Sequence, residues 1–259
     1  KKMGKRFKIA HFYAGTYSKL ISALKADGTK ITYTAAAHDV NESRKEFEAY
    51  GIPYDFPHMT DPNLFSRYVD GYKQADLVIC PSSYSKRIME GYGCINVKVI
   101  PHGCEPAKNI KPISGFNVGY LGQIGPDKGL IYLIKAWAEL NYKDSQLVIA
   151  GSQSAHLMPL IRKIGRGSIF LAGFVKTIDE LYNNCSVYVQ PSVTEGFGME
   201  VVEAMSYGRP VICSDGAGAV DCVNAENGTV VPKRNTTALV NAINFYKSNP
   251  EILTAHGSN

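Results

Sequence analysis

Long apolar runs, basic stripes and paired cysteines are all missing from this 259-residue sequence. No window approaches about 18 consecutive apolar residues, so we expect no transmembrane helix. The basic start, KKMGKR, is not followed by the apolar core of a secretion signal. The six cysteines include no CxxC pair, so neither a zinc site nor a disulfide framework is expected. These absences predict a cytoplasmic protein with reduced thiols.

Three ligand-binding motifs are also absent. There is no Asp-x-Asp pair, which a diphosphate held through Mg²⁺ would usually need, and we therefore predict neither metal nor cofactor. The GxxxxGK[ST] order of a Walker loop does not occur. Residues 216–221, GAGAVD, lack the final glycine of a dinucleotide fingerprint and follow the wrong strand. Any phosphate site must therefore rely on other groups.

The charge that is present is mild. The formal net charge is +5, and outside the first six residues the Lys and Arg residues are scattered. Nucleic-acid binding would usually show a basic stripe, so that class of partner is not expected. A mild positive bias suits a small anionic ligand. Weak peripheral contact with a membrane through KKMGKR is an alternative to the favoured interpretation, a solvated basic terminus.

Apolar strands alternate with amphipathic helices, and the pattern occurs twice. Such alternation predicts α/β units with parallel sheets. A segment with two prolines and little periodicity, about 105–115, separates them. We predict a shortened first Rossmann-like domain over 1–106 and a second over 114–259, with a ligand site in the cleft between these doubly wound domains. Strands are expected at 5–13, 30–34, 76–80, 97–100, 117–121, 146–150, 169–171, 187–190 and 211–213.

One stretch, 190–210, combines a strand end, a glycine loop and a helix start. Unpaired N–H groups and the helix dipole converge there, which is typical of an anion site. Glu195 and Glu203 bracket it, and eight residues at helical rise separate them by ~12 Å. That span suits a sugar and a ribose on either side of a diphosphate. On spacing alone a structural role is favoured, but Glu203 lies in an apolar run where burial of an acid is costly.

Two further positions could contribute to a ligand site. Lys128 follows a glycine-rich turn, 122–129, just before a helix, and is either a phosphate clamp or a solvated turn residue. His38 lies beside Asp39 at a strand end, where a structural and a ligand-facing role are about equally expected.

The second unit resembles the retaining GT-B glycosyltransferases, in the family-4-like group. The segment EGFGMEVVE, 195–203, matches their Glu-x7-Glu signature. The blocks LVIAGSQ, LAGFV, DELYNNCSVYVQPSVTEGFG and ICSDGAGAVDCV extend the match, and the first unit matches more weakly through His38-Asp39, DLVICPSS and VIPHG.

The resemblance implies a nucleotide-diphosphate-sugar donor, a hydroxyl acceptor (glycan, lipid or small molecule) and metal-independent transfer with retention of configuration. Glu195 and His38 would be catalytic, Glu195 contacting the donor sugar and His38 approaching it from across the cleft. In donor binding, Glu203 would hold the ribose hydroxyls. The diphosphate would be neutralised by Lys128 and by the N–H groups of Gly196, Phe197 and Gly198. Gly122 and Gln123 would form part of the loop that holds the donor, and Phe174 and Val175 would flank the base.

The sequence departs from the family pattern at three points. Gln123 stands where an arginine is usual, the first unit is short, and 236–247 is expected to be the last helix, without one that crosses back to the first domain. Two other classes therefore stay open. One is a nucleotide-sugar epimerase or a phosphorylase of the same fold, and the other is a non-catalytic nucleotide-sugar-binding protein.

Overall fold

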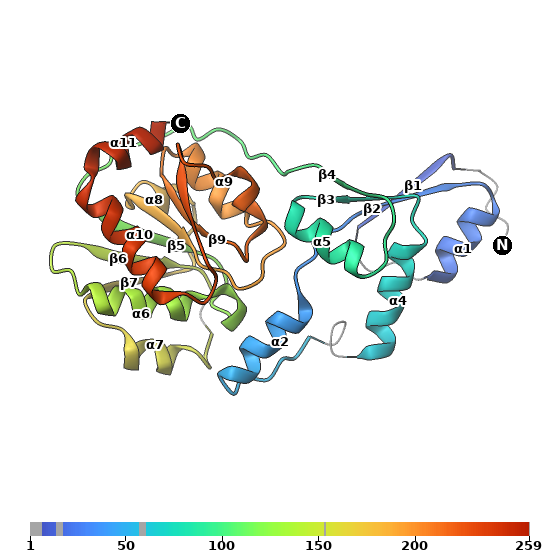
Figure 1. The fold of residues 1–259 in the computed structure, drawn as a ribbon, viewed down its shortest axis with the longest axis horizontal. Coiled ribbons are helices and arrows are strands. Elements are labelled where there is room, and N and C mark those ends of the chain that lie inside the picture. The colour runs from blue at the N-terminus through green and yellow to red at the C-terminus, as the bar shows by residue number, and fades with distance from the viewer. Residues whose placement is uncertain (1–6, 14–17, 57–60, 153, 259) are drawn as a thin grey trace.

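The computed structural model describes residues 7–13, 18–56, 61–152 and 154–258. They form two α/β units joined by an extended connector, 100–116, that contains neither helix nor strand (Figure 1). The KKMGKR start lies outside the described residues. No described helix is both long and apolar enough to cross a membrane.

The first unit is built on a four-stranded parallel sheet. Its strands follow the order β1-β2-β3-β4. Buried side chains of β2 and β3 alternate with half-exposed ones, and the buried set joins α1 and α5 in one core. The helices α1, α4 and α5 lie on one side of this sheet (Figure 1). The elements are β1 (Ile9–Tyr13), α1 (Ser18–Ala26), β2 (Lys30–Thr34), α2 (Val40–Ala49), α4 (Pro62–Lys73), β3 (Leu77–Cys80), α5 (Ser83–Gly91) and β4 (Val97–Val99).

The second unit has a six-stranded parallel sheet in the order β10-β9-β8-β5-β6-β7. Core clusters cover both faces, one around Trp137 and the other around Tyr182 and Tyr188, as a doubly wound sheet requires. The strands are β5 (Asn117–Leu121), β6 (Gln146–Ala150), β7 (Ser168–Gly173), β8 (Val187–Gln190), β9 (Val211–Ser214) and β10 (Gly228–Val231). The helices are η1 (Pro126–Lys128), α6 (Leu130–Leu140), α7 (Met158–Ile164), α8 (Asp179–Tyr182), α9 (Met199–Ser206), η2 (Gly218–Cys222), α10 (Thr236–Ser248) and α11 (Pro250–Ser258).

Two features of the helices differ notably from the sequence prediction. The sequence pattern predicts a polar helix over 44–50, but α2 begins at Val40, because the Asp39 carboxylate caps it by accepting from the N–H groups of Asn41 and Glu42. The prediction that 236–247 is the last helix is wrong. Helix α11 follows, with Pro250 in its first turn, and its His256 side chain hydrogen-bonds the Tyr246 hydroxyl of α10 at 3.0 Å.

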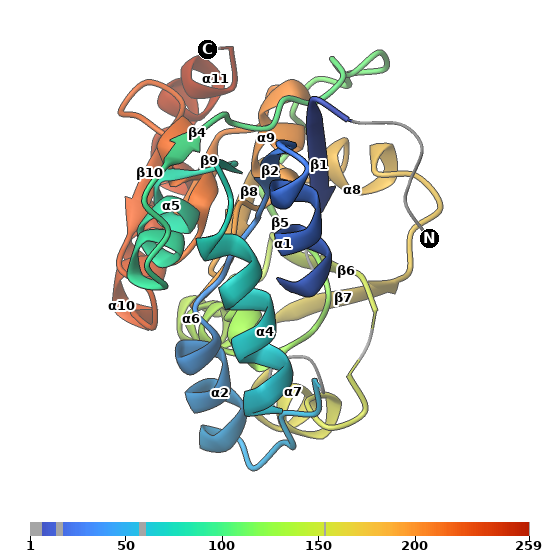
Figure 2. The ribbon, with the colours of Figure 1, turned by 90° about the vertical axis from the view of Figure 1, so that its right-hand side faces the viewer.

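Helix α2 leaves the sheet of its own unit and packs against the second. In Figure 1 it lies below the other helices of the first unit and next to α6. Tyr50 and Ile52, which follow α2, pack against the core of the second unit. Ser43 donates to the Asp127 carboxylate in η1 at 2.8 Å. Seen from the side, the first unit's helices α1 and α4 lie in front of the second unit (Figure 2). The two units are therefore held together by apolar packing and by polar contacts.

Candidate functional site

Backbone hydrogen bonds hold the loop from β8 to α9 against the loop that follows β9. Glu195 pairs with the adjacent loop, its N–H donating to Gly216 O at 2.9 Å and its carbonyl accepting from Gly218 N at 3.0 Å. The Phe197 carbonyl accepts from Ala219 N at 2.7 Å. Gly198 starts α9 with φ 98°, a left-handed conformation that few other residues adopt. The helix N-terminus therefore lies at the carboxyl end of β8, as the sequence predicts.

Glu195 and Lys128 form an ion pair within this loop region. Lys128 ends η1, and its ammonium group donates to Glu195 Oε2. Burial alone would lower the pKa of Lys128, but the carboxylates of Glu195, Asp127 and Glu200 together raise it. Lys128 is therefore a charged, half-buried cation at the helix N-terminus, where a diphosphate could bind.

Glu200 is a third carboxylate in this group, and the sequence analysis did not single it out. It lies in the first turn of α9, and burial raises its pKa while Glu195 and Glu203 add to the increase. Its carboxylate lies close to Gly122. The signal that could have found it is an acid at a helix start next to a predicted anion site, which commonly interacts with the helix dipole.

His38 faces the same loop from the first unit. Burial lowers its pKa, while the charges of Asp127 and Glu195 act in the opposite direction. The N–H of Asp39 donates to Thr194 Oγ1 at 2.7 Å, which fixes the His38 segment beside the β8–α9 loop. A side chain on Gly196 would meet Ala36 O at 2.7 Å, so only glycine permits this approach. The structure thus brings His38, Glu195 and Lys128 into one electrostatic group.

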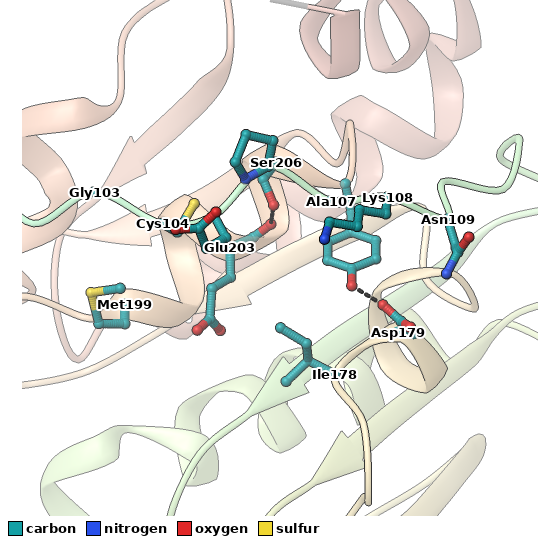
Figure 3. Close-up of a pocket in the computed structure, with 13 residues that line it drawn as sticks. Gly103, Cys104, Ala107, Lys108, Asn109, Ile178, Asp179, Met199, Glu203 and Ser206 are labelled. Atoms are coloured by element: carbon teal, nitrogen blue, oxygen red, sulfur yellow. Dashed lines mark hydrogen bonds between the residues drawn. The ribbon is translucent and has the colours of Figure 1, made fainter.

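Glu203 lines a separate hollow of about 810 Å³ between the connector and the second unit. Its Oε2 accepts from the buried Tyr182 hydroxyl at 3.0 Å. Figure 3 shows its carboxylate pointing away from the connector, into the space between Met199 and Ile178. Tyr207 and Asp179 also line this hollow, and the Tyr207 hydroxyl donates to the Asp179 carboxylate. Connector residues 103–109 form one wall, which the sequence analysis did not foresee.

The other predicted donor-binding residues differ in their surroundings. Gly122 follows β5 with φ 149°. The Gln123 carbonyl accepts from the Tyr120 hydroxyl at 3.1 Å, and Gln123 itself is exposed. Phe174 is 86% exposed. Val175 lines a smaller cavity of about 320 Å³ that shares no lining residue with the Glu203 hollow. The roles of these residues at the donor stay predictions.

The arrangement places a cation and a helix N-terminus between two carboxylate-lined regions. Backbone N–H groups and Lys128 can bind an anionic diphosphate. The carboxylates of Glu195 and Glu203 can accept hydrogen bonds from hydroxyl groups on either side. Among the described residues, no group of three His, Cys, Asp or Glu side chains is placed to hold a metal ion.

Residues 115–249 match the family described as Glycosyl transferases group 1. One relative is the lipopolysaccharide core biosynthesis mannosyltransferase LpcC of Rhizobium leguminosarum bv. viciae, 32% identical over 153 residues, which cover 55% of this chain and 44% of that protein. Another is the capsular polysaccharide biosynthesis glycosyltransferase CapM of Staphylococcus aureus, 32% identical over 135 residues, covering 49% of this chain and 36% of that protein. The chain thus spans less than half the length of either relative.

Solved structures share the fold across nearly the whole chain. Sucrose-phosphate synthase from Thermosynechococcus elongatus superposes with a TM-score of 0.76 at 20% identity, covering 97% of this chain and 67% of that one. Anabaena Alr3699/HepE in complex with UDP gives 0.74 at 22% identity, covering 96% and 71%. The fold is therefore the GT-B arrangement of two Rossmann-like domains. Together with the match over more than half of its length, this places the chain in the family Glycosyl transferases group 1.

Proposed function

We propose that the protein is a retaining glycosyltransferase that moves a sugar from a nucleotide-diphosphate-sugar to a hydroxyl acceptor without a metal ion. The observation that carries the proposal is the grouping of His38, Glu195 and Lys128 at the N-terminus of α9, beside a separate hollow that contains Glu203. The acceptor is a glycan, a lipid or a small molecule.

The reaction breaks the bond between the anomeric carbon and the diphosphate oxygen, where negative charge develops. Lys128 and the N–H groups at the start of α9 stabilise that charge, which is where preorganised donors accelerate a reaction most. The acceptor hydroxyl forms the new C–O bond on the same face, and its proton passes to the leaving diphosphate. The likeness of 195–203 to the retaining signature supports this stereochemistry.

Glu195 and Lys128 must change partners when donor binds. In the structure they neutralise each other. A diphosphate near Lys128 provides a competing anion, and Glu195 becomes available to sugar hydroxyls. His38, whose pKa is lowered by burial, is neutral at pH 7 and can hydrogen-bond the transferred sugar without adding charge.

Glu203 binds the ribose in this proposal. Its carboxylate is already oriented by the Tyr182 hydroxyl, which leaves its other oxygen for a ribose hydroxyl. Ile178 lies across the hollow and offers an apolar surface to the nucleoside (Figure 3). The six thiols, all free, support a reducing compartment such as the cytoplasm.

The test begins with thermal-shift measurements on UDP, GDP and ADP, because a ligand that binds the folded state raises its stability by mass action. UDP is tried first, since a structural neighbour is described in complex with it. NMR of a labelled nucleotide sugar with candidate acceptors then reports product and anomeric configuration. Isomerised sugar without acceptor would instead indicate an epimerase.

Two controls bear on the mechanism. Glu195→Ala is expected to abolish most transfer while leaving UDP binding measurable, and transfer at the wild-type rate would contradict the role of Glu195. Activity is expected to persist in EDTA. An absolute requirement for Mg²⁺ would refute the proposed stabilisation of the diphosphate by Lys128 and the helix N-terminus.

A further inference from the structure

Two serine hydroxyls of the first domain bind a carbonyl of the β8–α9 loop. Ser82 caps α5 and Ser85 lies in its first turn, and both side chains are buried. Ser82 Oγ donates to the Gly196 carbonyl at 2.6 Å, and Ser85 Oγ donates to the same oxygen at 2.9 Å. A carbonyl of the loop that carries Glu195 is therefore bound by the opposite domain.

These contacts complete a set of three consecutive carbonyls that are all hydrogen-bonded. The neighbouring carbonyls of Glu195 and Phe197 accept from Gly218 N and Ala219 N. In a planar trans peptide the N–H points opposite to the C=O, so fixing a carbonyl also fixes the adjacent N–H. Among the described residues, none accepts from the N–H groups of Gly196, Phe197 or Gly198. These three donors are therefore oriented and have no acceptor among the described residues.

Close packing leaves the Gly196 carbonyl no alternative position. A methyl group on Gly218 would overlap both Ser82 Oγ and Gly196 O. A methyl group on Gly196 would press on Ala36 O of the first domain. Well-packed surroundings of this kind resist a peptide rotation that would redirect the N–H groups.

Ser85 also contacts the segment that carries His38. Its hydroxyl donates to Ala37 O at 2.7 Å as well as to Gly196 O. A hydroxyl has one proton, so the two carbonyls share it. One oxygen atom thereby connects the residue before His38 with the residue after Glu195.

We propose that Ser82 and Ser85 are positioning residues of the donor site, which hold the N–H groups of residues 196–198 in place for the donor diphosphate. The inference rests on the proposed function, because it assumes a nucleoside diphosphate at the start of α9. Neither serine lines the hollow that contains Glu203, where the nucleoside would bind. Their effect is therefore expected on the diphosphate portion of the ligand.

The experiment compares the wild-type chain with Ser85→Ala, Ser82→Ala/Ser85→Ala and a matched control, Ser83→Ala. Ser83 lies on the same turn and in the same interface, but its hydroxyl donates to Asp221 at 2.6 Å and not to Gly196. Calorimetry measures the dissociation constants of UDP, GDP and ADP and of uridine, guanosine and adenosine. Circular dichroism verifies that each variant is folded.

Loss of one hydrogen bond to the Gly196 carbonyl is expected to weaken nucleoside diphosphate binding about fivefold in Ser85→Ala, and more in the double variant. Binding of the matching nucleoside stays unchanged, and Ser83→Ala binds both ligands like wild type. A general loosening of the domain interface would instead affect Ser83→Ala equally, or weaken nucleoside and diphosphate together, and either result overturns the inference.

The positioning role and the proposed function can be refuted separately. If the wild-type chain and the double variant bind a nucleoside diphosphate alike, the positioning role is wrong and the proposed function stands. If the wild-type chain binds none of the three diphosphates, the proposed function fails, and the inference fails with it.

Discussion

Replacing Arg234 with methionine tests what holds helix α2 against the second domain. Arg234 follows β10, and its Nε donates to Glu46 Oε1 at 2.5 Å while its Nη1 donates to Glu42 Oε2 at 2.7 Å. The Glu46 side chain is only 4% exposed, compared with 32% for Arg234. Arg234 has φ 61°, and methionine carries the same backbone cost there, so the substitution isolates the guanidinium.

The expected loss of stability depends on the hydrogen-bond partners that Glu46 retains. Without Arg234, the partner that remains among the described residues is the Tyr132 hydroxyl at 3.2 Å, so a nearly buried carboxylate loses its counter-charge. Breaking a buried pair costs about 3–5 kcal/mol. Since Arg234 is partly exposed, water screens the change, and we expect about 3 kcal/mol of destabilisation. In a chain of this size that lowers Tm by roughly 6–12 °C.

The assay is urea and thermal unfolding of Arg234→Met, Glu46→Gln and the double variant. The double variant is expected to be more stable than the sum of the single changes predicts, because Glu46→Gln removes the unpaired charge. Lys233→Met is the control, since the Lys233 ammonium group donates to Glu42 at 3.1 Å near the surface, and its loss should cost at most about 1 kcal/mol. The reasoning is refuted if Arg234→Met is as stable as wild type, or if the two single effects are additive.

Four other outcomes are expected. The pKa of Glu42 is lowered from 4.5 to about 2 by its hydrogen bonds to cationic side chains, so its contribution to the free energy of unfolding is complete above pH 4.5 and is lost as pH falls toward 2, which acid titration of Tm would show. Lys128→Gln should weaken UDP binding about tenfold or more and reduce its salt dependence, as calorimetry at two salt concentrations would detect. Because burial lowers the pKa of His38, kcat/KM should fall through protonation of this residue only below pH 6.5, and a fall already above that pH would contradict the assignment. Gly196→Ala places a methyl group 2.7 Å from Ala36 O and should lower both Tm and the rate of sugar transfer. Unchanged values of both would show that the domain interface can adjust to the added methyl group.

The sequence predicts the strands well because each is a short apolar run between turn residues. The ranges predicted for β2, β5, β6 and β8 agree with the structure. The same local signals locate the glycine loop at the start of α9, where we propose that the diphosphate binds. Side-chain capping explains the main error in a helix start, since Asp39 begins α2 before its periodic residues do.

The contacts between distant segments could not be predicted in this way. Glu42 and Glu46 meet residues about 190 positions later in the chain, and nothing in either local pattern specifies the pairing. The position of connector residues 103–109 beside Glu203 could not be predicted either, because a segment without periodicity gives no indication of which surface it covers. Placement of such partners depends on how the two domains pack, which is a property of the whole chain.

Helix α2 belongs to the first domain by sequence and to the second by its contacts. Tyr50 and Ile52 pack against the second core, and Glu46 pairs with Arg234. Any opening of the two sheets would therefore carry α2 with the second domain as part of one rigid body. Because the chain enters α2 from β2 and returns from it to α4, such a movement would have to be taken up on both sides of α2, including the extended segment 35–39 that contains His38. Any movement of that segment would also change the position of the His38 imidazole relative to the β8–α9 loop.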